Sequence, residues 1–571
     1  MIAASFVDCG DGVRLERGVG CRMTDGIELF SDHYYPPQLG PNPTLLMRQP
    51  YGRDIASTVV YAHPVWFARN GYNVVIQDVR GRGDSAGEFY PFRHEARDGA
   101  ETIAWLRTRT ECDGRVGMYG FSYQGMTQLL GAAEQPEGLV CIAPGMTADD
   151  LYRGWFYQHG ALRLSATLGW GLQLLRADTR RRKLRDASAR LEKAWADLAV
   201  QTGVLPLREH PALQGEGVPR YVLDWLDHDQ PGEYWTSLDV SERLHSIQVP
   251  ALHICGWYDI FLYGSVHAFL ALCNYAGSAF AREHQYLIAG PWQHIPWGDR
   301  IGAANFSSEA LLDTDAILLR WFNHWLKDSG EFAGEPRVRR FVLGENRWRP
   351  ASNFPEEANH TLYLHSGGRA NSRKGDGVLS ADPPAPDEPS DIFVYDPEVP
   401  VVAPGGHAGA SGQFDQATLE LGNNLLVYTT APLDRPLLVF GFPRLALHCA
   451  SSAAHTDFTA KLVRVRPHGA AEFICLGIAR SGHLFAETSY AADKIHLWQF
   501  LLEPTSCRFD AGDCIRLEIA SSAFPLYDRN PGSGVPSCRA SSWDWRRSTQ
   551  TVYHRLTCPS VLRLPVEEVI E

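Results

Sequence analysis

A serine stands in a short turn between an apolar run and a segment that favours a helix. Residues 120–125 read GFSYQG, after the apolar run 116–119 and before the helix-forming residues 126–133. A strand, a sharp turn and a helix in this order form a nucleophile elbow, which exposes the hydroxyl of a strained serine. Small residues around the serine let the strand and the helix approach closely. The pattern predicts acyl transfer through a serine ester at Ser122.

A serine nucleophile needs a histidine base, and that base needs an acid to orient it. In the fold that carries such an elbow, the chain order is serine, then aspartate or glutamate, then histidine. Asp259 follows the apolar run 251–255, and His294 follows the apolar run 285–289. Both residues stand just past the carboxyl ends of predicted strands, where open α/β sheets carry their sites. The sequence therefore predicts that Ser122, Asp259 and His294 form a catalytic triad.

The segments that must position this triad alternate between short apolar strands and helices. Residues 13–35 alternate like a β-hairpin, and residues 98–110 have the spacing of a helix. Further apolar runs that predict buried strands lie at 44–48, 72–78 and 139–143. Such alternation predicts a mostly parallel sheet that helices cover on both faces. We assign residues 1–150 and 241–350 to an α/β-hydrolase catalytic domain.

Two stretches depart from this alternation. Residues 151–240 have helical spacing and few strand-like runs, which predicts a helical cap inserted over the carboxyl ends of the strands. After a predicted helix at 308–327, residues 351–571 show short alternating runs separated by Pro, Gly and Asp. That pattern predicts an all-β jelly-roll domain. Residues 367–390, rich in Gly, Pro, Asp and Ser, are expected to form a long surface loop.

Motifs along nearly the whole chain match one family. The catalytic part contains RQPYGR at 48–53, QDVRGRGDSAGEF at 77–89, GWYD at 256–259 and GPWQH at 290–294. The C-terminal part contains YDP at 395–397, FDAG at 509–512, ASSAFP at 520–525 and DRNP at 528–531. On these residues the chain resembles the CocE/NonD hydrolases, which include serine esterases, acylases and, more distantly, X-Pro dipeptidyl peptidases.

The resemblance implies an α/β-hydrolase domain, a helical cap and a galactose-binding-like jelly roll. It also implies an oxyanion hole made of a tyrosine hydroxyl, which maps to Tyr51, and the backbone N–H of Tyr123. The chain lacks the His-Gly-Gly-Gly loop that many esterases use for this purpose. A neutral phenol and an N–H aimed at the developing oxyanion would stabilise a tetrahedral intermediate.

The acyl pocket is expected between the cap and the ends of the strands. Its candidate walls are aromatic residues that similar positions supply in the family, namely Trp155, Phe156, Trp170 and Phe261. The family's α-amino-acid ester hydrolases carry acidic residues after the triad aspartate, whereas here Asp259 is followed by the apolar residues 260–262. An apolar lining would not offset the desolvation of an ammonium group. We therefore expect an uncharged acyl group; otherwise Asp149 and Asp150 are the nearest candidates for a compensating carboxylate.

Together these residues predict a serine esterase or acylase that cleaves a small-molecule ester or amide, with dipeptidyl-peptidase activity less expected. No metal or cofactor is required by this chemistry. An acyltransferase or transesterase that uses the same triad with an alcohol or amine acceptor stays open, because only the access of water differs. A catalytically inactive carbohydrate-binding protein is a further alternative, against which the complete triad argues.

The composition of the chain limits the kinds of partner that the protein is expected to bind. A net charge of −13 over 571 residues argues against nucleic acid or an anionic membrane as the main partner. The sequence has no run of about 18 apolar residues, so no membrane span is predicted. The N-terminal sequence does not resemble a signal peptide. The 12 cysteines are scattered without a CxxC pair, which favours reduced thiols and a cytoplasmic location. The sequence leaves open whether the protein is a monomer or a homodimer.

Overall fold

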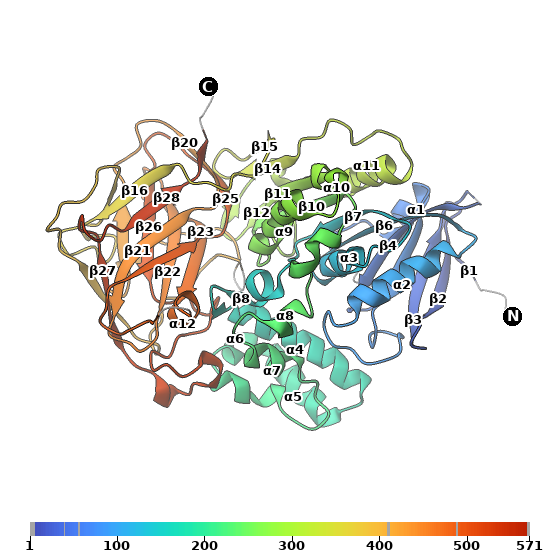
Figure 1. Ribbon diagram of the computed structural model, residues 1–571, viewed down its shortest axis with the longest axis horizontal. Helices are drawn as coiled ribbons and strands as arrows, with labels where there is room; N and C mark the ends of the chain where they lie inside the picture. The colour runs from blue at the N-terminus through green and yellow to red at the C-terminus, as the bar shows by residue number, and fades with distance from the viewer. Residues whose placement is uncertain (1–5, 39, 55–57, 408–410, 487–488, 568–571) are drawn as a thin grey trace.

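The computed structural model describes residues 6–38, 40–54, 58–407, 411–486 and 489–567 (Figure 1). The beginning of the chain, on which the expected absence of a signal peptide rests, lies in part outside the described residues. Within the described ranges, no helix is both long enough and apolar enough to span a bilayer.

A large mixed sheet forms the core of the N-terminal half. Its described strands run in the order β1-β2-β3-β5-β4-β6-β7-β10-β11-β14-β15. The bounds of these strands are β1 (Phe6–Asp8), β2 (Arg14–Arg22), β3 (Glu28–Tyr35), β4 (Asn42–Gln49), β5 (Asn73–Asp78), β6 (Cys112–Phe121), β7 (Leu139–Gly145), β10 (Ala251–Tyr258), β11 (Gln285–Gln293), β14 (Val338–Val342) and β15 (Arg347–Ala351). From β5 to β14 neighbouring strands pair in parallel, and the outer strands pair antiparallel. The predicted hairpin and the mostly parallel sheet are confirmed.

Helices cover both faces of this sheet. Helices α1 (Pro64–Arg69) and α11 (Thr314–Leu326) lie on one face, and α2 (Glu95–Arg107), α3 (Tyr123–Ala133) and α9 (Leu262–Tyr275) lie on the other. Because side chains alternate along a strand, Leu45 and Met47 of β4 belong to the hydrophobic cluster of the first face, and Leu46 belongs to that of the second. The buried strands of this domain are therefore apolar on both sides.

The helix predicted at 308–327 begins later than expected. Residues Ser308–Ala310 form a separate 3₁₀ turn, and α11 starts at Thr314. The reason is local: the side chain of Asp313 accepts a hydrogen bond of 2.9 Å from the N–H of Ala316, and an aspartate in this position caps a helix.

The segment between β7 and β10 carries the helical insertion, which lies below the other two parts in Figure 1. Its helices are α4 (Leu164–Arg181), α5 (Arg185–Ala196), α6 (Leu198–Gln201), α7 (Tyr221–Asp227) and α8 (Glu233–Thr236). The first residues of the insertion are not α-helical. They form a π-helical turn, Tyr152–Phe156, and a two-stranded hairpin of β8 (Tyr157–Gln158) and β9 (Ala161–Leu162).

The C-terminal part is all-β and lies to the left in Figure 1. Its larger sheet has the strand order β18-β27-β21-β28-β16-β17-β19-β26-β22-β23, with β24 paired to β21, and β25-β20-β29 form a smaller sheet. The strands are β16 (His360–His365), β17 (Val378–Ser380), β18 (Asp391–Tyr395), β19 (Leu426–Thr429), β20 (Leu437–Gly441), β21 (Arg444–Ser451), β22 (Asp457–Val465), β23 (Ala471–Arg480), β24 (His496–Leu501), β25 (Thr505–Phe509), β26 (Cys514–Ala520), β27 (Ser548–Tyr553), β28 (Val561–Leu564) and β29 (Val566–Glu567). The jelly-roll topology stays a prediction.

The prediction of one long surface loop at 367–390 is wrong at its centre. Strand β17 interrupts this segment and pairs antiparallel with β16 and parallel with β19. The pairing buries Leu379, which is 2% exposed, and the polar residues around it hide this short strand in the sequence.

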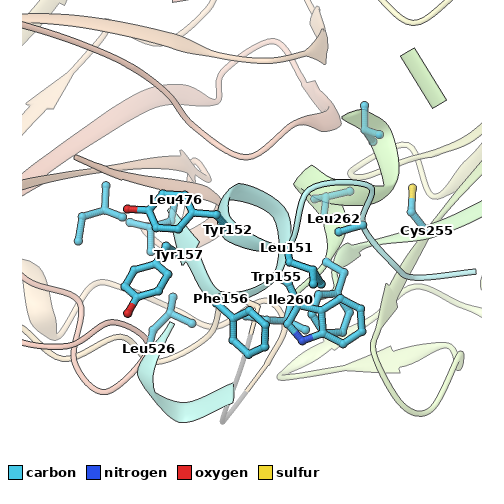
Figure 2. Packing of buried hydrophobic residues seen from close by; sticks show 14 of the residues in the cluster. Leu151, Tyr152, Trp155, Phe156, Tyr157, Cys255, Ile260, Leu262, Leu476 and Leu526 are labelled. Carbon is cyan, nitrogen blue, oxygen red and sulfur yellow. The ribbon is translucent and has the colours of Figure 1, made fainter. Parts of the chain in front are cut away.

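The hairpin after β7 joins the cap to the β domain. Asp528 and Leu162 exchange two hydrogen bonds, one of 3.0 Å between backbones and one of 2.9 Å to the Asp528 carboxylate. Figure 2 shows Trp155 and Tyr157 of this segment packed among Leu262 of the α/β domain and Leu526 of the β domain. The three parts of the chain thus share one continuous hydrophobic core.

Candidate active site

Ser122 occupies the sharp turn between β6 and α3. Its backbone has φ 61° and ψ −126°, a strained conformation for a residue with a side chain. The N–H of Ser122 donates to the carbonyl oxygens of Gly145 (2.9 Å) and Met146 (3.2 Å) at the end of β7. These bonds hold the strained residue in place, so the predicted elbow is present.

Two glycines make the turn sterically feasible. A Cβ atom on Gly120, which has φ +138°, would stand 2.5 Å from Cβ of Gln124. A Cβ atom on Gly125 would stand 2.7 Å from Cβ of Thr147. A larger residue at position 120 would push α3 away from β6, and one at position 125 would push α3 away from the segment that follows β7.

Asp259 and His294 leave the ends of two neighbouring parallel strands. Strands β10 and β11 are in register at Gly256 and Gly290, which brings the two following loops together. His294 Nδ1 donates to Asp259 Oδ1 at 2.8 Å, and Asp259 is fully buried. This bond fixes the ring orientation and leaves Nε2 as the nitrogen available for proton transfer.

Ser122 and His294 line the same cavity, which has a volume of about 520 Å³. The cavity lies between the cap and the carboxyl ends of the strands, where the sequence predicts the acyl pocket. Its walls are Tyr51, Val59, Phe121, Ser122, Gln124, Trp155, Ser165, Ala166, Thr167, Gly169, Trp170, Gln173, Trp195, Ile260, Phe261, His294 and Ile295. This set contains no Asp, Glu, Lys or Arg among the described residues.

Tyr51 enters the cavity from the loop after β4. Its N–H donates to Gln49 Oε1 at 2.8 Å, and its hydroxyl accepts a hydrogen bond of 3.0 Å from Trp170 Nε1. Burial raises the pKa of Tyr51 to about 12, although hydrogen bonds with Trp170 and Ser122 oppose this effect. The phenol is therefore a neutral donor at physiological pH, next to the serine.

Tyr123 is the first residue of α3, so its N–H has no acceptor within the helix. Its side chain is anchored on the opposite side: the hydroxyl donates to Glu95 Oε1 at 2.7 Å and accepts from the N–H of Phe92 at 3.0 Å. Glu95 in turn pairs with the buried Arg48 at 2.8 Å. This chain of contacts holds Tyr123 in place, so the N–H of the residue after Ser122 has a fixed position.

Three of the four predicted pocket aromatics line the cavity, namely Trp155, Trp170 and Phe261. The rings of Trp155 and Phe261 are 4.0 Å apart between centroids. Phe156 does not line it. Phe156 is fully buried and packs on Trp225, with 4.5 Å between the ring centroids, because successive side chains of the π-helical turn point in different directions.

Several wall residues were not predicted from the sequence. Val59 and Ile295 stand close to Tyr51 and His294 in the chain, and this proximity was a usable signal. Trp195 comes from α5 and had no such signal. The carboxylates considered as an alternative lie elsewhere: Asp149 pairs with His267 at 2.8 Å, and Asp150 contacts Arg153.

No group of three or more His, Cys, Asp or Glu side chains suited to a metal ion occurs in the described ranges. At the cavity stand a hydroxyl, an imidazole that is hydrogen-bonded to a buried carboxylate, and a neutral phenol.

Comparisons with known proteins identify the family of this chain. A family model described as X-Pro dipeptidyl-peptidase (S15 family) matches residues 25–296, and one described as the X-Pro dipeptidyl-peptidase C-terminal non-catalytic domain matches residues 330–563. The chain is 36% identical over 566 residues to cocaine esterase of Rhodococcus sp. (strain MB1 Bresler), a match that covers 95% of this chain and 97% of the relative. The chain belongs to the CocE/NonD family of hydrolases.

Solved structures of similar fold cover nearly the whole CocE/NonD chain. An α-amino acid ester hydrolase matches with a TM-score of 0.79 and 24% identity over 98% of each chain. A CocE/NonD family hydrolase from Staphylococcus aureus matches with a TM-score of 0.69 and 18% identity, over 97% of this chain and 94% of that one. The predicted α/β-hydrolase domain followed by an all-β domain is thereby confirmed, and the protein is a hydrolase of the serine-esterase class.

Proposed function

We propose that this enzyme hydrolyses small-molecule esters, and amides of similar shape, that carry an uncharged acyl group, through an acyl-enzyme on Ser122. One observation carries the proposal. The strained elbow serine and a histidine that is hydrogen-bonded to a buried aspartate open into one apolar cavity.

The proposed reaction follows from the roles of these groups. Ser122 Oγ attacks the substrate carbonyl while His294 Nε2 takes the hydroxyl proton, and the imidazolium then returns this proton to the departing alcohol or amine. Water attacks the resulting ester by the same route and releases the acid. Asp259 keeps the imidazole in the correct tautomer and stabilises its charged form.

Two donors are proposed to stabilise the tetrahedral oxyanion, namely the hydroxyl of Tyr51 and the N–H of Tyr123. The pKa of about 12 keeps the phenol protonated. Because Trp170 donates to the Tyr51 oxygen, it does not take the phenol proton, which can be donated to the oxyanion. Preorganised donors of this kind act mainly in the transition state.

The acyl group is proposed to lie against Trp155, Trp170 and Phe261. These rings offer a large apolar surface, and the described cavity wall provides no charged side chain to pair with a charged acyl group. Burial of an unpaired charge costs several kcal/mol, so uncharged acyl groups are favoured. The cocaine esterase relative is named for an ester substrate, which supports the reaction class.

The test is covalent labelling with a fluorophosphonate, followed by intact-mass analysis and peptide mapping. One adduct on Ser122 is expected, together with a burst of p-nitrophenol from an activated ester. Ser122→Ala should lose the adduct and about 10⁶-fold in kcat. Ser165→Ala is the matched control, because Ser165 lines the same cavity and should be dispensable for labelling. An adduct that persists in Ser122→Ala would overturn the proposal.

A further inference from the structure

A buried ion pair stands behind the proposed catalytic acid, at the junction of the three parts of the chain. Arg163 precedes α4 in the cap, and Glu503 follows β24 in the β domain. Arg163 Nη2 lies 2.9 Å from Glu503 Oε1, and both side chains are fully buried. The two residues are 340 positions apart in the chain, so only the assembled fold brings them together.

The same guanidinium reaches the loop of the catalytic aspartate. Arg163 Nη1 donates to the carbonyl oxygen of Ile260 at 2.8 Å. Ile260 stands between Asp259, which orients His294, and Phe261, whose ring lies 5.1 Å from that of His294. This hydrogen bond holds the carbonyl of the peptide that joins Ile260 to Phe261, one residue after the acid.

Glu503 is itself tied to the neighbouring strand by its backbone. Its N–H donates to the carbonyl oxygen of Leu476 on β23 at 3.0 Å, and its carboxylate orients the guanidinium that it pairs with. Figure 2 shows Leu476 and Ile260 on the two sides of the cap segment that leads to Arg163. The β domain thus reaches the acid loop through Glu503 and Arg163.

Stability alone does not account well for such a pair. Removal of two charges from water is costly, and hydrophobic replacement of a buried ion pair is often neutral or stabilising. Positioning is a better explanation, because a misplacement of about 1 Å caused far from the reacting atoms can cost about 10²-fold in rate.

We propose that Glu503 of the β domain and Arg163 of the cap are positioning residues for the reaction: together they hold the Ile260 carbonyl and thereby place Asp259 and Phe261 around His294. The inference rests on the proposed triad. It assigns a part in the reaction to a domain whose family model describes it as non-catalytic.

The test uses the full chain and replaces the pair by apolar residues, Arg163→Met with Glu503→Leu. The double change avoids leaving one buried charge without its partner, which would be strongly destabilising. Active sites are counted by titration with a fluorophosphonate. We expect an unfolding temperature close to that of the parent, little change in KM and a kcat per titrated site that falls about 10²-fold.

A matched control replaces another buried pair, whose members do not line the cavity. Lys461 and Glu518 of the β domain are 2.8 Å apart and nearly buried, and Lys461→Met with Glu518→Leu should leave kcat per site unchanged. Arg163→Lys keeps the positive charge and a donor. It should therefore recover most of the rate lost in the Arg163→Met and Glu503→Leu double variant.

A double-mutant cycle separates positioning from general support of the fold. In an Asp259→Asn background, loss of the Arg163 and Glu503 pair should cost little more, because residues that act as one unit are non-additive. A full 10²-fold loss in both backgrounds, or an unchanged kcat in the otherwise native enzyme, would overturn the inference. Failure of the parent enzyme to label at Ser122 would instead overturn the proposed function.

Discussion

Trp170 Nε1 donates a hydrogen bond of 3.0 Å to Tyr51 Oη, and both side chains line the cavity of Ser122. An indole N–H can only donate, so the Tyr51 oxygen is the acceptor and its proton is directed elsewhere. A hydrogen bond received by a hydroxyl also strengthens the bond that it gives. A helix of the cap therefore orients a hydroxyl that the α/β domain supplies, and the proposed oxyanion hole is complete only when the cap is in place.

Tyr51→Phe should lower kcat about 10²–10³-fold with little change in KM, because the hydroxyl acts mainly in the transition state. Steady-state kinetics on a p-nitrophenyl ester measure both constants. A change confined to KM would show that Tyr51 binds the substrate and takes no part in stabilising the oxyanion.

Trp170→Phe should keep an aromatic wall and remove only the indole donor. We expect a smaller loss of kcat than in Tyr51→Phe, since the phenol remains but is less well oriented. In the Tyr51→Phe background the same change should have almost no further effect on kcat. Equal losses in both backgrounds would mean that Trp170 acts through the acyl pocket alone.

Asp259→Asn should leave the geometry intact but favour the wrong imidazole tautomer, at a cost of about 10⁴-fold in kcat. His294→Ala should cost at least as much. Because the two residues are proposed to act as one unit, the kcat of the double variant should be little below that of the less active single variant. A double variant far below both single variants would contradict the pairing.

A buried network in the β domain should make stability depend on pH. Burial acts to raise the pKa of Asp391, but hydrogen bonds from His554, the N–H of Ala370, Ser366 and Tyr428 outweigh it and hold the pKa below the ordinary value of 3.8. A carboxyl with a depressed pKa contributes stability that is fully present above pH 3.8 and is lost as the pH falls through the folded-state pKa.

Asp391→Asn should therefore lower the unfolding temperature at pH 7, where buried donors lose a charged acceptor worth about 1–3 kcal/mol. The difference from the parent should shrink as the pH falls below 3.8. Thermal melts over a pH series measure it, and Asp387→Asn, at an exposed position on the same domain, is the control. A difference that stays constant down to acid pH would show that the network does not depend on the Asp391 charge.

Part of the site could be predicted from the sequence, because of where its residues stand relative to the strands. Asp259 and His294 could be predicted because each directly follows a buried strand, and parallel strands end at one edge of a sheet. Trp155 and Phe156 are neighbours of similar chemistry, and only the local π-helical turn decides which of them meets the cavity. The spacing of apolar residues in the sequence does not show which of the two side chains faces the cavity in such a turn.

Long-range contacts could not be read from the sequence either. The Arg163 and Glu503 pair joins segments 340 residues apart, and each residue alone resembles an ordinary surface charge. Trp195 reaches the cavity from the second long helix of the cap, whose position depends on the packing of the whole insertion. A single sequence contains no local pattern that reports these contacts.

The apolar cavity wall predicts discrimination against a charged acyl group. Phenylacetyl and phenylglycyl methyl esters differ only by the α-amino group, and near pH 6 the amine is mostly protonated, since α-amino groups titrate at about 7.7–8.0. Burial of the ammonium beside Ile260 and Phe261 without a partner would cost several kcal/mol. At about 1.4 kcal/mol per decade, kcat/KM should be at least about 10²-fold higher for the phenylacetyl ester.

This difference in kcat/KM between the two esters should narrow above pH 8, where the amine is neutral. It should also narrow at pH 6 in Gln173→Glu, which places a carboxylate of nearly the same shape in the cavity wall. Equal or faster hydrolysis of the phenylglycyl ester at pH 6 would contradict the proposed preference, because it would require a carboxylate that the described wall does not provide.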